Sequence, residues 1–341
     1  MEDTVPNPRR NLERTQPIPR VRQPAPSYQT LGRPAVQVKL KKRRASRSCL
    51  SVIAMGVAGF LILVMMAVLG RALVSEWAAR QPHTNVLILG LDRRPEQGTV
   101  VRSDTMMVLT AYPPEAHVGL LSIPRDLYVE IPGHGTSRIN TAHFWGESEA
   151  TGNGPPLAMA TVEQNFGVPM HHYVRVDFEG FRAVIDAVGG IDVVVEEPIV
   201  DATYPTEDYG TIRIEIPAGP QHMDGEMALW YARSRHGSSD FDRARRQQEI
   251  VMALVRRMLQ PGAWPRLPAV YQAVRSNVDT DMGIGDLLLL FAALEEAGPE
   301  GIEHHVIGPE MTQPWTTPTG GAVLLPRWEL IHPLVEGFLA P

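Results

Sequence analysis

The segment that decides the fold is SDTMMVLTAYPPEAHVGLLSIPRD, residues 103–126. Residues 105–112 and 117–123 are mostly apolar, and they flank a four-residue turn that begins with two prolines. This pattern predicts two adjacent antiparallel strands in a covered sheet. If the turn sets the register, Asp104 lies opposite Arg125 at the open end of the hairpin, where Pro124 ends the second strand.

Charged residues bracket this predicted hairpin. Arg102 and Asp104 stand before its first strand, and Arg125 and Asp126 follow its second. One interpretation is an ion pair that ties the strand ends together, and the other is part of a polar site at one edge of the sheet. The hairpin alone does not decide between them.

The rest of the central region alternates between strand-like and helix-like patterns. The run NVLILGL at 85–91 predicts a buried strand that ends at Asp92. Further strands are predicted over residues 127–131, 173–176, 191–195 and 211–216, and helices over 156–166, 178–188, 225–232, 242–260 and 284–297. We therefore expect an α/β fold, with a mixed central sheet covered by helices as an α/β/α sandwich.

The N-terminal part differs from the rest in charge and composition. The chain carries a net charge of -6, but residues 1–47 contain twelve Arg and Lys against three acidic residues, about +9, which leaves about -15 for the remainder. This basic stretch lacks the apolar residues for a core, and disorder is expected. Residues 48–70 carry no charge and predict a transmembrane helix. The positive-inside rule places residues 1–47 in the cytoplasm and the region after Arg71 outside.

A cluster of arginines lies farther along the chain. Five arginines occur between Arg233 and Arg246, in a region that is acidic overall. Arg243 and Gln247 share one helix face, and Asp240 stands just before it. A solvated charged face explains such a run, but guanidinium groups also bind phosphate oxygens in a bidentate manner.

Asp92 raises the question of a metal ion. It ends the first predicted strand, at the edge where ligands bind in α/β sheets. Asp92 and Asp104 could share a hard divalent cation, because Mg²⁺ needs only one or two carboxylates when substrate phosphates complete its shell. The alternative is that Asp92 caps the following turn.

Several other chemistries lack support. The sequence contains no HExxH pair, Walker A, GxGxxG or GxSxG motif. Nucleic-acid binding is not expected, because the acidic region after the N-terminal tail has no stripe of basic and aromatic residues.

Seven ordered blocks resemble the LytR-CpsA-Psr domain over about residues 84–260. They are GLDRR (90–94), VRSDTMMV (101–108), LLSIPRDLYVEIPG (120–133), RIN (138–140), VDFEGFRAVIDAVGGIDVVV (176–195), DGEMALWYARSRH (224–236) and DFDRARRQQ (240–248). Together with the composition and charge of the N-terminal part, the expected layout is a basic cytoplasmic tail (1–47), a transmembrane helix (48–70), a linker (71–83), the catalytic domain (84–260) and a helical extension without an assignable motif (261–341). An anchor before the domain also fits the usual layout of the family.

The resemblance implies an extracytoplasmic phosphotransferase that moves a glycopolymer from a polyprenyl pyrophosphate carrier to peptidoglycan, with the polyprenyl chain in an apolar tunnel. It implies that Arg102, Arg125, Arg233 and Arg235 hold the pyrophosphate and that Asp92 and Asp104 hold Mg²⁺ or Mn²⁺. Arg138, Asp240, Arg243 and Gln247 would complete the polar pocket. Arg138 departs from the lysine that is more usual in the family, so a forked donor replaces a point charge.

These residues are compatible with two proton acceptors and with three functions. Transfer needs a sugar hydroxyl to attack phosphorus, and either Asp104 or Asp126 could accept its proton. A polyprenyl pyrophosphate hydrolase would use the same residues with water as the acceptor. A non-catalytic membrane protein that binds polyprenyl lipids or has a regulatory role is a further alternative.

Overall fold

The computed structural model describes residues 62, 64–66, 68–81, 83–93, 98–234 and 239–339. The expected basic tail, most of the expected transmembrane segment and Arg235 lie outside these residues. Within them, no helix combines the length and the apolar character that crossing a membrane requires. Residues 68–78 are helical and lead into the first strand.

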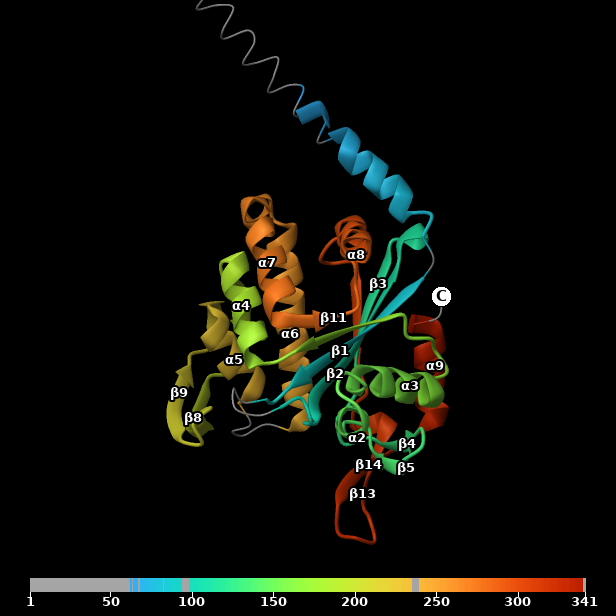
Figure 1. Cartoon of the computed structure of the whole chain (residues 1–341). Helices are drawn as coiled ribbons and strands as arrows, with labels where there is room; N and C mark the ends of the chain where they lie inside the picture. Colours follow the sequence, from blue (N-terminus) through green and yellow to red (C-terminus); the bar gives the residue numbers. More distant parts are fainter. Residues whose placement is uncertain are drawn as a thin grey trace, which may run out of the picture. The chain divides into compact units, whose positions relative to one another are not determined.

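The centre of the fold is a mixed six-stranded sheet (Figure 1). Its order is β11-β6-β1-β2-β3-β12, with β6 parallel to β1, β12 parallel to β3, and the other neighbours antiparallel. The strands are β1 (Thr84–Leu91), β2 (Ser103–Tyr112), β3 (His117–Ser122), β6 (His172–Val176), β11 (Val278–Thr280) and β12 (Ile302–Val306). The expected mixed sheet with flanking helices is confirmed.

The hairpin β2–β3 has the register that its turn predicts. Tyr112 pairs with His117 and Met107 pairs with Ser122 around the short helix η1 (Pro113–Glu115). Ala116 adopts the left-handed conformation at φ 51°, which closes the turn. Continuing this register places Asp104 opposite Arg125, as expected.

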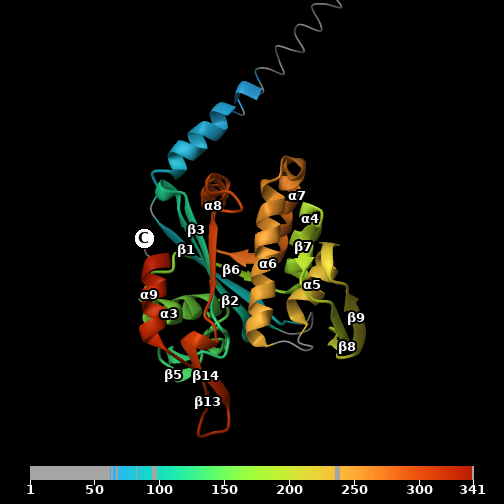
Figure 2. The same ribbon diagram turned by 180° about the vertical axis from the view of Figure 1, so that it is seen from behind.

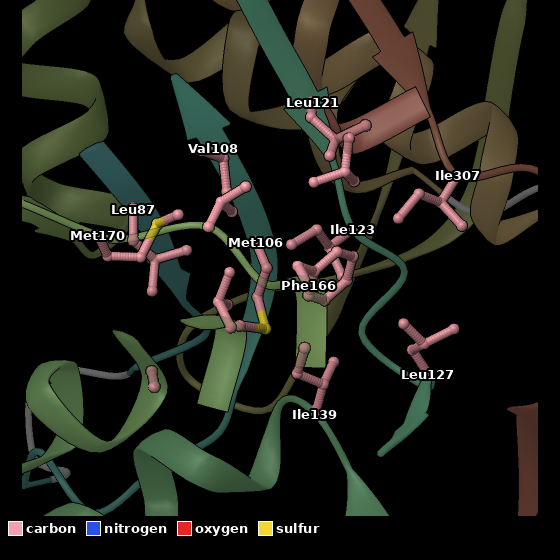
Figure 3. Packing of buried hydrophobic residues seen from close by; sticks show 14 of the residues in the cluster. Leu87, Met106, Val108, Leu121, Ile123, Leu127, Ile139, Phe166, Met170 and Ile307 are labelled. Atoms are coloured by element: carbon pink, nitrogen blue, oxygen red, sulfur yellow. The ribbon is translucent and has the colours of Figure 1, made fainter. Parts of the chain in front are cut away.

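One face of the sheet packs against three helices. These are α2 (Thr141–Glu149), α3 (Gly154–Phe166) and α9 (Trp328–Leu339). Leu87, Met106 and Leu121 from the sheet belong to one buried apolar cluster with Phe166 of α3 (Figure 3). Alternate residues of the strands point to this face, which explains the near-continuous apolar runs in the sequence.

The opposite face packs against α6 (Asp240–Leu259) and α8 (Ile284–Ala297). Val86, Met107 and Leu120 meet Met252 of α6 and Leu294 of α8 there. Helices therefore cover both faces of the sheet, which is visible from both sides in Figures 1 and 2.

A third apolar cluster lies beside the sheet. Ile185 and Val188 of α4 contact Ile250 of α6 and Tyr231 of α5 within it. Its elements are α4 (Phe178–Val188), β7 (Ile191–Val195), β8 (Ile199–Pro205), β9 (Thr211–Ile216), β10 (Gly219–Met223), α5 (Gly225–Arg233), η2 (Pro261–Arg266) and α7 (Leu267–Asn277). Asp224 caps α5 by accepting a hydrogen bond from the Met227 amide at 2.9 Å, as the sequence indicates.

Residues 261–341 contain strands as well as helices, so their description as a helical extension is incomplete. β11 and β12 are the two edge strands of the central sheet. The antiparallel strands β13 (Thr312–Thr316) and β14 (Ala322–Pro326) form a hairpin that follows η3 (Pro309–Met311). It lies against the hairpin of β4 (Tyr128–Ile131) and β5 (Gly135–Arg138), where Leu127 bridges to Leu324.

Candidate active site

A cavity of about 460 Å³ lies where β1 and β6 end and β2 begins, near α5 and the N-terminal half of α6. Its interior is apolar because side chains from the sheet, α4, α5 and α6 converge on it. They are Ile88, Met107, Val176, Phe178, Phe181, Leu229, Ile250 and Val251. A long apolar chain fits the chemistry of this lining.

Charged and polar side chains also line the cavity. They are Asp92, Asp104, Asp177, Asp201, Arg233, Arg243 and Gln247. Asp92 and Asp104 therefore contribute to one cavity, as the position of the strand ends predicts. One lining presents both an apolar compartment and groups that bind phosphate or a hard cation.

Arg125 lies at the centre of a carboxylate cluster. Its Nη1 donates to Asp104 Oδ1 at 2.8 Å, its Nη2 lies 3.5 Å from Asp240 Oδ2, and its Nε lies 3.5 Å from Asp126 Oδ2. Burial lowers the pKa of Arg125, but the three carboxylates outweigh this effect and raise it. The guanidinium is therefore a fixed positive charge, and its fork is shared among three acids.

A smaller cavity of about 40 Å³ adjoins this cluster. Asp104, Arg243 and Gln247 line both cavities. Arg125, Asp126 and Asp240 line the smaller one. The smaller cavity thus brings together predicted residues of the hairpin and of α6, namely Asp104, Arg125, Asp126, Asp240, Arg243 and Gln247.

The start of α6 positions Asp240 and Arg243. Ser239 caps the helix and exchanges hydrogen bonds with Asp242 in a capping box. Arg243 Nη1 lies 2.7 Å from Asp240 Oδ1, and its side chain is buried. The Gln247 amide, one turn along, donates to the carbonyl of Ala232 at 3.4 Å.

Arg233 is held by aromatic rings at the end of α5. Its guanidinium carbon lies 3.9 Å from the centre of the Phe178 ring, and Nη1 donates to the Tyr204 hydroxyl at 3.1 Å. Nη2 lies 3.6 Å from Asp92 Oδ2. Burial raises the pKa of Tyr204 and outweighs Arg233, which acts to lower it. The Tyr204 hydroxyl is therefore neutral and can accept the hydrogen bond from Arg233. A stacked, planar cation therefore faces the cavity.

Other predicted residues take different places. Arg102 is exposed and lines neither cavity. Arg138 lies 3.2 Å from Asp126 Oδ1 and also donates to the carbonyl of Ala322 at 2.8 Å. It joins the cluster from outside the cavities. Arg235 lies outside the described residues.

Two carboxylates that line the cavity were not predicted from the sequence. Asp177 caps α4 and forms an ion pair with Arg93. Asp201 is buried in β8, where it accepts a hydrogen bond from the Thr203 amide at 3.0 Å. An Asp immediately before the predicted helix at 178 was a signal for the first. The sequence of β8 gave no signal for the second.

A buried ionic cluster holds the segment that precedes Arg102. The Glu147 side chain is fully buried, accepts from Thr99 Oγ1 at 2.6 Å and pairs with Arg175 Nη1 at 2.5 Å. His143 Nδ1 contacts the carbonyl of Val101 at 2.7 Å. Burial lowers the pKa of His143, so a neutral ring donates this bond.

The described residues contain no group of three or more His, Cys, Asp or Glu side chains placed to hold a metal ion. The cavity nevertheless presents Asp92 and Asp104, which are partly accessible at 40% and 32%. Two carboxylates with accessible oxygens suit Mg²⁺ when phosphate oxygens supply further ligands. The donor set therefore fits a phosphate-bound cation.

The chain is similar to known proteins of one family. The model of the LytR_cpsA_psr family matches residues 71–317. The polyisoprenyl-teichoic acid–peptidoglycan teichoic acid transferase TagU of Oceanobacillus iheyensis is 36% identical over 208 residues, which are 60% of this chain and 61% of that protein. TagT of Bacillus subtilis, a transferase of the same description, is 30% identical over 221 residues, 64% of this chain and 66% of that protein.

The fold is shared with solved structures. The crystal structure of B. subtilis TagV superposes with a TM-score of 0.63 at 28% identity, covering 76% of this chain and 98% of that one. The matches to TagU and TagT each span a little less than two thirds of the relative's length.

Proposed function

The chain belongs to the LytR_cpsA_psr family, and from this premise we propose that it transfers a glycopolymer from a polyprenyl pyrophosphate carrier to peptidoglycan. The observation that carries the proposal is that the cavity of about 460 Å³ combines an apolar interior with a lining of arginines and carboxylates. A polyprenyl chain would occupy the apolar part, and its pyrophosphate would lie against the arginines.

We assign roles to the residues as follows. Arg125 and Arg233 bind the pyrophosphate oxygens, joined by Arg102 and Arg235 from the neighbouring segments. Arg138, Asp240, Arg243 and Gln247 shape and charge the polar pocket. Asp240 and Asp104 hold the Arg125 guanidinium in place, and a bound phosphate would replace some of these contacts.

Asp92 and Asp104 would hold Mg²⁺ or Mn²⁺. The cation, when bound, neutralises charge on the phosphate oxygens. Each of these carboxylates is paired with an arginine in the structure, Asp92 with Arg233 and Asp104 with Arg125. The residues proposed to hold the metal ion are therefore neighbours of those proposed to hold the pyrophosphate, which supports the proposal of one shared site.

The transfer balances as a displacement at phosphorus. A hydroxyl oxygen of the acceptor glycan forms a bond to the phosphorus that carries the glycopolymer, and the bond from this phosphorus to the polyprenyl phosphate breaks. The hydroxyl proton passes to a carboxylate, Asp104 or Asp126, and polyprenyl phosphate leaves. Arginines stabilise the charge on the equatorial and leaving oxygens, which is the largest contribution expected of the site.

We also propose that residues 48–70 anchor the protein in the membrane, with residues 1–47 in the cytoplasm and the domain outside. A transmembrane anchor keeps the cavity close to a lipid-linked donor. A reporter enzyme fused after residue 80 tests this topology, since activity restricted to the cytoplasm contradicts it.

One assay separates the proposed transferase from its alternatives. The chain is incubated with a polyprenyl pyrophosphate-linked oligosaccharide, peptidoglycan and Mg²⁺. Covalent attachment of the oligosaccharide to the glycan supports transfer. Release of free phosphorylated oligosaccharide indicates a hydrolase. Binding of the lipid without either product indicates a non-catalytic lipid-binding protein.

A further inference from the structure

An aromatic pair lies beside the carboxylate cluster, with Tyr128 half-buried and Trp315 exposed. Tyr128 of β4 and Trp315 of β13 have ring centres 5.7 Å apart, tilted by 53°. Trp315 is 39% exposed. A large ring that remains open to solvent in a strand pair offers a face for a ligand, since it is not used by the core.

A cross-strand pairing and two ion pairs connect the aromatic pair to the carboxylate cluster. Tyr128 is the cross-strand partner of Arg138, and such partners lie about 5 Å apart between Cβ atoms. Arg138 contacts Asp126 at 3.2 Å, and Asp126 lies 3.5 Å from Arg125. Tyr128 is therefore the strand partner of Arg138, the residue that contacts the proposed proton acceptor Asp126.

Hydrogen bonds fix the hairpin that carries Trp315 to this edge. The Leu324 amide donates to the carbonyl of Asp126 at 3.0 Å, and Arg138 donates to the carbonyl of Ala322 at 2.8 and 3.1 Å. Leu324 also lines the smaller cavity beside Arg125. Figures 1 and 2 show β13 and β14 projecting from the body next to β4 and β5. The C-terminal hairpin is thus part of the site's surroundings.

We propose that Tyr128 and Trp315 form a stacking platform for the acceptor glycan, which this chain would hold with one sugar hydroxyl directed at the carboxylate cluster. The proposal rests on the proposed transferase function and adds where its acceptor binds. The C–H faces of pyranose rings pack on the electron-rich faces of aromatic rings, and exposed Trp and Tyr supply such faces at low entropic cost.

The occupant follows from the neighbouring chemistry. The donor lipid has its apolar compartment elsewhere, in the cavity lined by Phe178, Phe181 and Leu229. Asp126 and Arg138 at the platform's edge can accept from and donate to hydroxyl and acetamido groups. A neutral polar ring with an apolar face matches this combination better than an anionic or a purely apolar ligand does.

The test compares acceptor and donor binding in the full chain, solubilised in detergent. Trp315→Ala is expected to raise the KM for peptidoglycan glycan strands about tenfold, which is within the range known for aromatic stacking. The KM for the lipid-linked donor should stay within about twofold of wild type. Trp315→Phe should restore most of the loss. Trp264→Ala, at a tryptophan of η2 that is 46% exposed, is the matched control.

A second readout does not depend on turnover. Co-sedimentation with insoluble glycan strands, without donor, should weaken about tenfold in Trp315→Ala and Tyr128→Ala but not in Trp264→Ala. If wild type lacks transfer but shows this pattern, the platform stands and the proposed function fails. If wild type transfers, yet neither acceptor KM nor sedimentation changes in the variants, the platform is overturned. A change in donor KM alone also overturns it.

Discussion

Arg125 and Asp104 face each other across the open end of the β2–β3 hairpin, and Arg125 Nη1 donates to Asp104 Oδ1 at 2.8 Å. The pairing follows from the register of the ladder and not from adjacency in the sequence. Because Asp104 lines the large cavity and Arg125 the small one, this contact joins a structural ion pair to the proposed site.

Arg125→Ala should lower kcat for transfer about 100-fold or more, since it removes a cation aimed at the phosphate oxygens. The loss of folding free energy should stay below about 3 kcal/mol, the lower end of the cost of breaking a buried ion pair, because each carboxylate keeps another partner or water. Asp126 keeps its contact with Arg138, Asp240 keeps Arg243, and Asp104 is accessible to water. Initial rates and thermal unfolding by circular dichroism measure both effects. Arg245→Ala, at a half-exposed position on the same helix as Arg243, should change neither. Wild-type rates in Arg125→Ala would remove it from the site.

Arg233→Lys should behave almost as poorly as Arg233→Ala. A lysine keeps the charge but loses the planar stack on Phe178 and the forked contacts to Tyr204 and Asp92. Donor titrations should show a higher KM for the lipid in both variants. The matched control is Arg213→Lys on the exposed face of β9. Full activity of Arg233→Lys would mean that only the charge matters.

Asp92→Asn should increase the Mg²⁺ concentration needed for half-maximal activity at least tenfold, because the loss of an anionic ligand weakens binding of a hard cation. Removal of divalent ions with a chelator should abolish wild-type transfer, and Mg²⁺ or Mn²⁺ should restore it. Asp192→Asn, at a residue 65% exposed in β7, is the control. Undiminished activity in the chelator would contradict the metal assignment.

Glu147→Gln should lower the free energy of unfolding by about 3 kcal/mol, because it breaks a buried ion pair with Arg175. Arg175 keeps a second carboxylate, Asp279, at 2.6 Å, which limits the loss. Glu149→Gln on the same helix, at a side chain 54% exposed, should cost less than about 1 kcal/mol. Chemical denaturation compares the two variants. Equal, small effects would show that the cluster contributes little.

The same cluster predicts a pH dependence of stability. Burial raises the pKa of Glu147, but hydrogen bonds from Thr99, Gly152 and Arg175 outweigh it and lower the pKa below its ordinary 4.5. A depressed folded-state pKa adds stability above pH 4.5 that is lost as the pH falls through the lowered value. The unfolding temperature of wild type should therefore drop more steeply below pH 4.5 than that of Glu147→Gln. Parallel curves would contradict this assignment.

The sequence predicted the centre of the fold better than its edges. The apolar runs around Pro113 and the helix stops at Gly167 and Gly189 are local signals, so β1, β2, β3, α3 and α4 appear where expected. α2 was missed because it is short, weakly amphipathic and buries polar residues such as His143 and Glu147. β11 has only three residues, and its pairing with β6 is a long-range contact that no local pattern encodes.

The candidate site shows the same division. Asp92 follows the end of β1, Asp104 stands at the start of β2, and Arg243 and Gln247 share one face of α6, so the sequence could predict their place. Arg233 was indicated by the run of arginines in the sequence. Asp201 could not, since its position depends on how β8 folds back over the cavity. Trp315 belongs to a tail without a recognisable motif, and only the tertiary fold brings it to Tyr128.

The two edge strands of the central sheet come from the last third of the chain, β11 beside β6 and β12 beside β3. During synthesis the inner four strands are complete more than a hundred residues before β11 and β12 exist, and both of their edges then carry unpaired backbone groups. Premature termination before residue 302 would leave one edge open permanently. The order of synthesis thus exposes the nascent chain to edge-to-edge aggregation. β11 and β12 remove this exposure when they pair with β6 and β3.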